Sequence, residues 1–197
     1  MDGARRASGW LLVTGLSMLA VQVVLFAINE GWLPIAASSA TRRWNVVLAS
    51  AGVTVTLMGL AVFETVLARA GDEVSGRIGL VAYGLGAGAW IVSNLTLGFA
   101  APLGNYLIVA SGVAVLAFSA AVLRTRVLPD WAGWVAVAWS GFWLIRFAFP
   151  HGTFAPYMHQ PMLLLFGVLL LVQRGRLRRL TTSLVRMARS PLDPLVR

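Results

Sequence analysis

The chain has 197 residues, of which 58% are apolar and only 12% are charged, a composition that excludes an ordinary soluble domain. Its sixteen basic residues are all arginine and give a formal net charge of +9. Because most of these arginines flank long apolar runs, they indicate contact with a membrane surface, and we expect no nucleic-acid partner. The chain has no cysteine, which excludes disulfides, thiolate catalysis and cysteine-ligated metal.

Long apolar runs recur along the chain, without the strict alternation that is typical of barrel strands. A run of about 20 such residues crosses the hydrocarbon core as a helix, because the backbone must satisfy its own hydrogen bonds there. We therefore predict an all-α, polytopic transmembrane bundle of six helices within residues 1–175. The predicted spans are 10–28, 44–67, 78–100, 106–123, 131–149 and 158–174.

The arginines predict the orientation of this bundle. With six spans, thirteen arginines lie on the side of the two termini, two lie on the opposite side, and Arg146 lies within a span. The positive-inside rule then places both termini in the cytoplasm. The absence of lysine is typical of GC-rich codon usage and indicates a bacterial source. Together with the predicted spans, it leads us to expect a multi-pass protein of a bacterial cytoplasmic membrane.

In residues 176–197, leucines and arginines recur at helical spacing and predict a basic amphipathic helix that contacts membrane lipids.

Two acidic residues are candidates for catalysis within or beside the bilayer. Glu64 lies in the inner half of the second span, where burial inside the bundle would favour the neutral acid, which can donate a proton. The alternatives are contact with lipid headgroups or an ion pair with Arg69. Glu30 follows the outer end of the first span and is the second candidate acid.

Arg146 and both histidines gather near the outer end of the fifth span. An arginine at this depth can snorkel to headgroups, pair with Glu30, or bind an oxyanion or carbonyl group of a ligand. His151 and His159 lie in or beside the outer loop that follows. Their spacing matches no zinc signature and no pair of haem ligands on facing helices, so we predict no metal and no cofactor. They are candidates for acid–base catalysis or hydrogen bonding, with an inert interfacial position as the alternative.

Aromatic residues away from the predicted interfaces form a second group of candidates. Trp139 and Trp143 share one face of the fifth span, and Tyr83, Trp90 and Asn94 share one face of the third. An aromatic cavity below an arginine suits an amphiphile with one polar end, and aromatic faces stabilise a carbocation. Core packing is the alternative for the aromatics, and an interhelical hydrogen bond is the alternative for Asn94. The predicted substrate-binding residues are Arg146, Trp139, Trp143, Trp90, Tyr83, Phe142, Asn94 and Tyr106.

The third apolar run is rich in glycine, with Gly79, Gly84, Gly86 and Gly88. Small residues at such spacing allow two helices to approach closely. We therefore expect close packing within the bundle, or an oligomer contact through residues 78–100.

The stretch Leu128–Trp134, which reads Leu-Pro-Asp-Trp-Ala-Gly-Trp, opens the fifth span. It resembles a Leu-Pro-x-Trp-x-Gly-Trp loop of actinobacterial six-span integral membrane proteins of unassigned function, which implies a layout and no activity. More distantly, a glutamate in the second helix beside buried aromatics resembles the small membrane-bound terpene cyclases. This second resemblance implies cyclisation initiated by protonation of an alkene or epoxide, without a diphosphate–magnesium motif.

Three functions are compatible with these residues. The first is a membrane enzyme for an isoprenoid or lipid, in which Glu64 or Glu30 donates the proton and Arg146 or a histidine anchors the substrate. The second is a protein that binds or transports an amphiphile through Arg146 and the outer loop. The third is a structural subunit of a larger membrane complex. The joint occurrence of acids, an embedded arginine and buried tryptophans favours the first.

Overall fold

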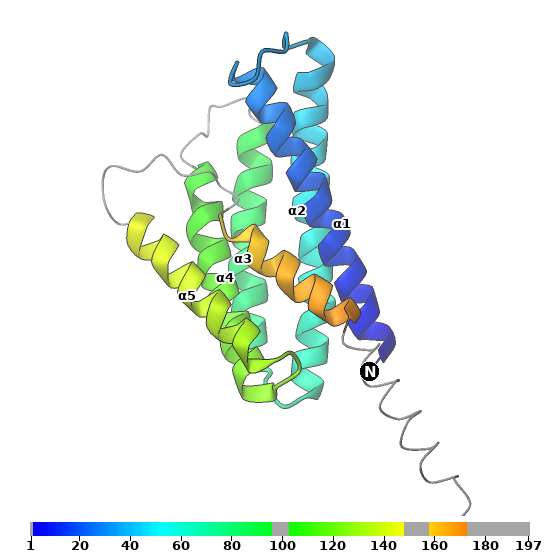
Figure 1. Ribbon diagram of the computed structural model, residues 1–197, viewed down its shortest axis with the longest axis vertical. Coiled ribbons are helices and arrows are strands. Elements are labelled where there is room, and N and C mark those ends of the chain that lie inside the picture. Colours follow the sequence, from blue (N-terminus) through cyan, green and yellow to red (C-terminus); the bar gives the residue numbers. More distant parts are fainter. Residues whose placement is uncertain (1, 96–102, 148–157, 173–197) are drawn as a thin grey trace, which may run out of the picture.

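The computed structural model describes residues 2–95, 103–147 and 158–172, and over these residues it is all-α, as predicted (Figure 1). Two antiparallel helix pairs, α1 with α2 and α3 with α4, lie side by side, and α5 packs on α4. A further helix, which we call the short helix, crosses the bundle obliquely (Figure 1). The helices are α1 (Asp2–Asn29), α2 (Ser39–Arg69), α3 (Val74–Leu95), α4 (Leu103–Thr125), α5 (Asp130–Phe147) and the short helix (Gln160–Val172).

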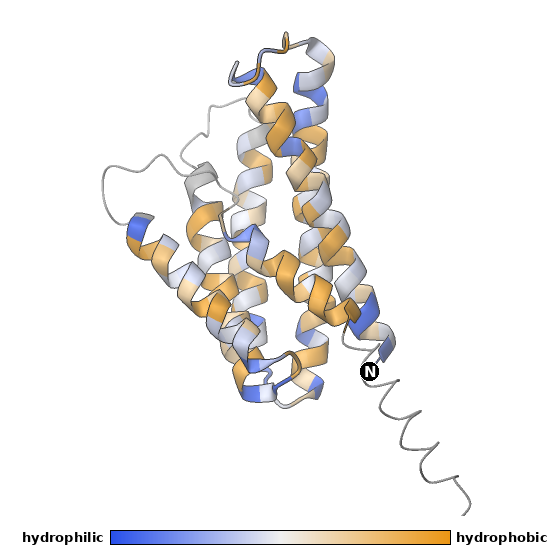
Figure 2. Ribbon diagram, in the orientation of Figure 1, coloured by the Kyte–Doolittle hydropathy of each residue, from blue (hydrophilic) through white to orange (hydrophobic). Residues whose placement is uncertain are grey.

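Among the described residues, three helices are long and apolar enough to cross a membrane, whereas six were predicted. The three are Asp2–Asn29, Ser39–Arg69 and Tyr106–Thr125. Figure 2 shows apolar residues along most of their length. The short helix is apolar but spans only about 20 Å at 1.5 Å per residue, less than the roughly 30 Å hydrocarbon core.

Glycines bring α1 and α2 into backbone contact. A Cβ atom on Gly15 would lie 2.6 Å from the backbone nitrogen of Thr56 and 2.8 Å from the carbonyl oxygen of Gly52. One end of the pair is tied by the buried Ser8 hydroxyl, which donates to the Gly59 carbonyl at 2.9 Å. Such contacts are typical of helix pairs in membranes, where close packing replaces the hydrophobic effect.

The predicted close packing of the glycine-rich third run is present within the bundle. A Cβ atom on Gly79 would lie 2.8 Å from the Phe118 ring, and one on Gly86 would lie 2.6 Å from Ala110, so both glycines face α4. A Cβ atom on Gly88 would meet nothing within 4 Å among the described residues. An oligomer contact through residues 78–100 stays a prediction.

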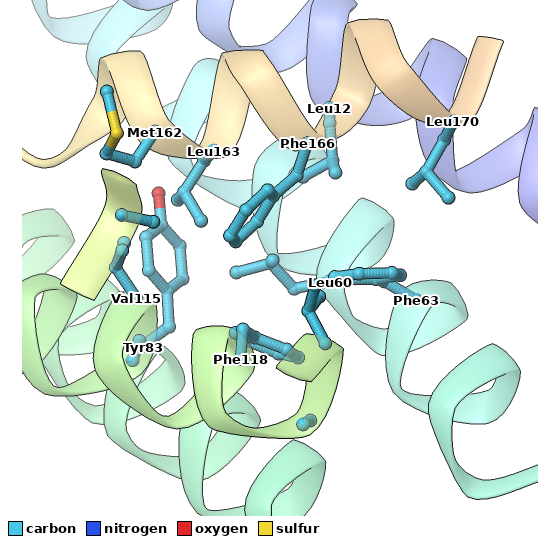
Figure 3. Packing of buried hydrophobic residues seen from close by; sticks show 14 of the residues in the cluster. Leu12, Leu60, Phe63, Tyr83, Val115, Phe118, Met162, Leu163, Phe166 and Leu170 are labelled. Carbon is cyan, nitrogen blue, oxygen red and sulfur yellow. The ribbon is translucent and has the colours of Figure 1, made fainter. Parts of the chain in front are cut away.

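The apolar core lies between the two helix pairs, and the short helix closes it. Figure 3 shows Leu163 and Phe166 pointing from the short helix toward the core residues of α2, α3 and α4. The Phe63 ring lies 5.6 Å from the Phe118 ring and 6.1 Å from the Phe166 ring, centroid to centroid. The Phe63 ring of α2 therefore contacts rings of both α4 and the short helix, and these contacts fix the position of the short helix.

Ion pairs close the end of the bundle that carries the α2–α3 and α4–α5 turns. The buried Asp72 carboxylate accepts from the Ser75 backbone N–H at 2.8 Å and from the Ser75 hydroxyl at 3.0 Å. It also accepts from Arg124 Nη1 at 3.3 Å, so the end of α4 is joined to the start of α3. Arg126 and Asp130 form a further pair at 3.8 Å across the α4–α5 turn.

Candidate functional site

A group of buried polar side chains lies where α5 meets the start of the short helix. His159 is fully buried, and its Nδ1 lies 3.3 Å from the hydroxyl of Ser140, which is also fully buried. The preceding residue on α5, Trp139, donates its indole N–H to the Met158 carbonyl at 2.6 Å. Pro161 lies in the first turn of the short helix, where its missing N–H costs no hydrogen bond. Two adjacent residues of α5 therefore hold the segment that enters the short helix.

Gln160 extends this polar group toward α3 and α2. Its amide nitrogen donates to the Tyr83 hydroxyl at 3.4 Å, and Tyr83 is fully buried. Tyr83 also interacts with the side chain of Thr56, whose hydroxyl donates to the Gly52 carbonyl at 2.8 Å. We call Thr56, Tyr83, Ser140, His159 and Gln160 the central polar cluster.

Two atoms of the central polar cluster are buried without a hydrogen-bond partner among the described residues: His159 Nε2 and Gln160 Oε1. The imidazole lies against α4, because a Cβ atom on Gly112 would lie only 2.9 Å from Nε2. Each such atom costs about 1 to 3 kcal/mol relative to a hydrogen-bonded one. The amide oxygen can only accept, whereas Nε2 donates or accepts according to the tautomer of the ring. A hydroxyl group, which can donate to the amide oxygen and also accept from or donate to Nε2, could satisfy this combination.

The aromatic candidates of α5 contact one another beside this cluster. The Trp139 and Trp143 rings lie 6.0 Å apart, and the Phe142 and Trp143 rings lie 5.2 Å apart, centroid to centroid. Trp139 is partly buried against the apolar core, as is Trp90 of α3, whereas Phe142 is mostly exposed. The three aromatic side chains of α5 therefore contact one another, and Trp139 links them to Met158, the residue that precedes His159.

Glu64 lies at the other end of α2, beside the first turn of α3. Its side chain is 14% exposed, and its carboxylate lies 3.7 Å from Arg77 Nε, so its partner is Arg77 and not the Arg69 considered from the sequence. Glu30 is exposed in the turn after α1, and Arg146 is exposed near the end of α5. Roles for these three residues as proton donors or ligand anchors stay predictions.

One further candidate with a described side chain lies apart from the central polar cluster. Tyr106 is mostly exposed and borders an apolar groove of about 420 Å³ between α3 and α4. His151 and the side chain of Asn94 lie outside the described residues. Within the described part of the chain, no three histidine, aspartate or glutamate side chains gather in a way that could hold a metal ion.

Sequence reasoning did not include Thr56, Ser140 and Gln160 among the candidates. It placed His159 in or beside an outer loop, and the structure places this histidine one residue before the short helix, fully buried. Serine and threonine within helices often bond to their own helix backbone, so neither hydroxyl is distinctive. A usable signal was the adjacent His159 and Gln160 at the head of an apolar run too short to span. Such a run draws its flanking polar residues toward the interior.

Replacing Glu64 with glutamine should change the free energy of unfolding by no more than about 1 kcal/mol, because its partner Arg77 is 69% exposed and such pairs are weak. Unfolding in detergent micelles titrated with a denaturing detergent measures this change. The Arg77→Gln variant and the double variant complete a cycle whose coupling energy should be equally small. A loss of several kcal/mol in Glu64→Gln would instead show that the carboxylate is held by stronger contacts.

Comparisons of the chain with protein-family models, with curated proteins and with solved structures found no match.

Proposed function

We propose that this chain is a six-span protein of the bacterial cytoplasmic membrane, with both termini in the cytoplasm, that binds or transports a small amphiphile. The polar group of the ligand enters the central polar cluster. The observation that carries this proposal is the pair of buried atoms, His159 Nε2 and Gln160 Oε1, which have no hydrogen-bond partner among the described residues of an apolar bundle. A ligand that bonds to them would recover the free energy that their burial costs.

The positions of the amino terminus and of two turns support the proposed topology. The amino terminus, the α2–α3 turn and the α4–α5 turn all lie toward one end of the bundle (Figure 1). Thirteen of the sixteen arginines belong to these three segments and the carboxyl-terminal residues. The positive-inside rule assigns an end with this excess to the cytoplasm.

The chemistry of the central polar cluster supports a ligand with a neutral polar group. Its side chains are hydroxyls, an amide and an imidazole, and none of its five members is a carboxylate or a guanidinium. Trp139, Trp143 and Phe142 supply an adjoining apolar surface. An isoprenoid alcohol, or a lipid with a hydroxyl group, matches both features.

An enzyme that cyclises an isoprenoid is the alternative proposal, with less support. The acid that it needs is Glu64 or Glu30. Glu64 lies beside Arg77, and Glu30 is exposed. Neither glutamate belongs to the central polar cluster.

The Gln160→Met variant tests the binding proposal, because methionine preserves the side-chain volume and removes both amide atoms. The hydrogen bond that it loses to Tyr83 is long, at 3.4 Å, so stability should change by about 1 kcal/mol or less. Photolabelling of the protein in lipid nanodiscs by a diazirine derivative of farnesol should fall about tenfold, because one good hydrogen bond contributes about 1.4 kcal/mol.

Gln22→Met is the matched control. Gln22 is also buried and also has an amide oxygen without a partner among the described residues, but it bonds to Asn45 within the α1–α2 pair. Labelling should be unchanged in this variant. Equal labelling of the wild-type protein and Gln160→Met would contradict the proposal. A cyclised product that disappears in Glu64→Gln would establish the enzymatic alternative instead.

A further inference from the structure

The end of the short helix is packed against the first turns of α1. A Cβ atom on Gly9 would lie 2.8 Å from the Leu171 side chain and 3.0 Å from the Gly167 carbonyl oxygen, so the two helices touch through their backbones. The short helix reaches the amino-terminal part of α1 in Figure 1. The described chain therefore ends, at Val172, beside the first turns of α1.

Two arginines of α1 lie near this junction. Arg5 and Arg6 lie one turn before Gly9 on α1. The sequence that follows Val172 contains four more arginines within seven residues: Arg174, Arg176, Arg178 and Arg179. The acidic residue in these two stretches is Asp2. The sequence on the two sides of this junction therefore contains an excess of arginine over acidic residues.

Arg5 and Arg6 differ from the arginines of the neighbouring turns. Arg77, Arg124 and Arg126 each have a carboxylate oxygen at 3.3 to 3.8 Å. Among the described residues, no carboxylate lies within ion-pair distance of Arg5 or Arg6. Arg5 Nε is also buried and has no hydrogen-bond partner in the described part of the chain. A buried guanidinium N–H without an acceptor is costly, so an anionic acceptor would stabilise it.

We propose that the junction of α1 with the end of the short helix binds the phosphate group of an anionic membrane lipid such as phosphatidylglycerol. Guanidinium groups bind phosphate oxygens through paired, charge-assisted hydrogen bonds. This end of the bundle is the one that carries most of the arginines, so it lies at the level of the inner headgroups in the proposed topology. The site is independent of the central polar cluster, since it shares no residue with it. A bound headgroup would also hold the short helix, whose first residues belong to that cluster, against α1.

Lipid binding by the Arg5→Gln, Arg6→Gln double variant tests this site. The full chain in a zwitterionic detergent is titrated with dioleoyl phosphatidylglycerol, and bound lipid is counted by native mass spectrometry. The double variant should bind about thirtyfold more weakly than the wild-type protein, because each arginine beside an anionic headgroup contributes about 1 kcal/mol and tenfold corresponds to about 1.4 kcal/mol. Dioleoyl phosphatidylcholine should bind poorly to both proteins.

Arg42→Gln with Arg43→Gln is the matched control, because it removes the same charge from exposed arginines in the first turns of α2. It should weaken binding less than threefold. Equal weakening by both pairs would show that only general charge matters, and unchanged binding in the Arg5, Arg6 variant would also overturn the site. The wild-type protein is also titrated with glycerol phosphate. If glycerol phosphate binds as tightly as the lipid, the ligand is a soluble phosphate and the lipid assignment is wrong.

The Arg5→Lys, Arg6→Lys variant keeps the proposal testable if the glutamine variant does not fold. It retains the charge but loses the planar, two-pronged donor, so lipid binding should weaken by about threefold to tenfold. Lipid binding equal to that of the wild-type protein would mean that charge alone holds the lipid and that no shaped site exists.

Discussion

Replacing Gly15 with alanine is expected to destabilise the protein by about 1 to 3 kcal/mol, the usual cost of overpacking a tight contact. The added Cβ atom would lie 2.6 Å from the Thr56 backbone nitrogen and 2.8 Å from the Gly52 carbonyl oxygen. Backbone atoms cannot rotate away, so α1 and α2 must separate along the whole pair. Unfolding of the purified protein in mixed micelles, followed by tryptophan fluorescence, measures the loss.

The control is Gly141→Ala on α5, where a Cβ atom would meet nothing within 4 Å among the described residues. Alanine is the better helix former by up to about 1 kcal/mol, so this variant should be as stable as the wild-type protein or slightly more stable. The two substitutions are chemically identical and are expected to have opposite signs. Equal effects would mean that α1 and α2 are not in backbone contact at Gly15.

Replacing Asp72 with alanine is expected to cost about 2 to 4 kcal/mol. The carboxylate accepts from the Ser75 backbone N–H, from the Ser75 hydroxyl and from Arg124, and the residue is buried. Loss of a helix cap costs about 0.5 to 2 kcal/mol, and each buried donor left without an acceptor costs about 1 to 3 kcal/mol. The contribution of Arg124 is small because its side chain is largely exposed. The same unfolding experiment measures this loss.

Glu73→Ala is the control for Asp72→Ala, since it removes a carboxylate from the next position. The Glu73 side chain is 66% exposed, and its pair with Arg77 is at 3.9 Å, so its loss should cost about 0.5 kcal/mol or less. Asp72→Asn should fall between the two, because the amide oxygen still accepts one hydrogen bond. If Asp72→Ala and Glu73→Ala lose the same stability, the buried cap is not what holds α3 to α4.

The helices lie close to the positions predicted from the apolar runs, although their ends differ. The second run begins at residue 44, whereas α2 begins at Ser39, because Ser38 and Thr41 form a capping box ahead of the apolar residues. The first run begins at residue 10, whereas α1 begins at Asp2 and includes a polar, arginine-bearing turn. Hydropathy identifies the segment that is apolar, and capping decides where the helix starts.

The candidate site could be predicted only in part. Tyr83, Trp139 and His159 were candidates, and the structure places Tyr83 and His159 in one buried cluster with Trp139 beside it. The two glutamates and Arg146 were candidates because charged residues are rare in apolar runs. A charged residue near the end of one helix can pair with a residue of the following helix, as Glu64 of α2 does with Arg77 of α3. The sequence does not show which partner such a residue meets.

The sequence by itself determined the helical class and the approximate position of each helix, whereas the excess of arginine on one side of the membrane stays a prediction. These properties depend on local composition, which is readable without knowing how helices pack. Only the tertiary structure decided that Gly15 meets Thr56, that Asp72 joins α3 to α4, and that His159 is buried beside Ser140. The physical reason is that these helices are apolar around most of their circumference. Their periodicity therefore does not indicate which face turns inward, and helix rotation and crossing decide which polar side chains meet.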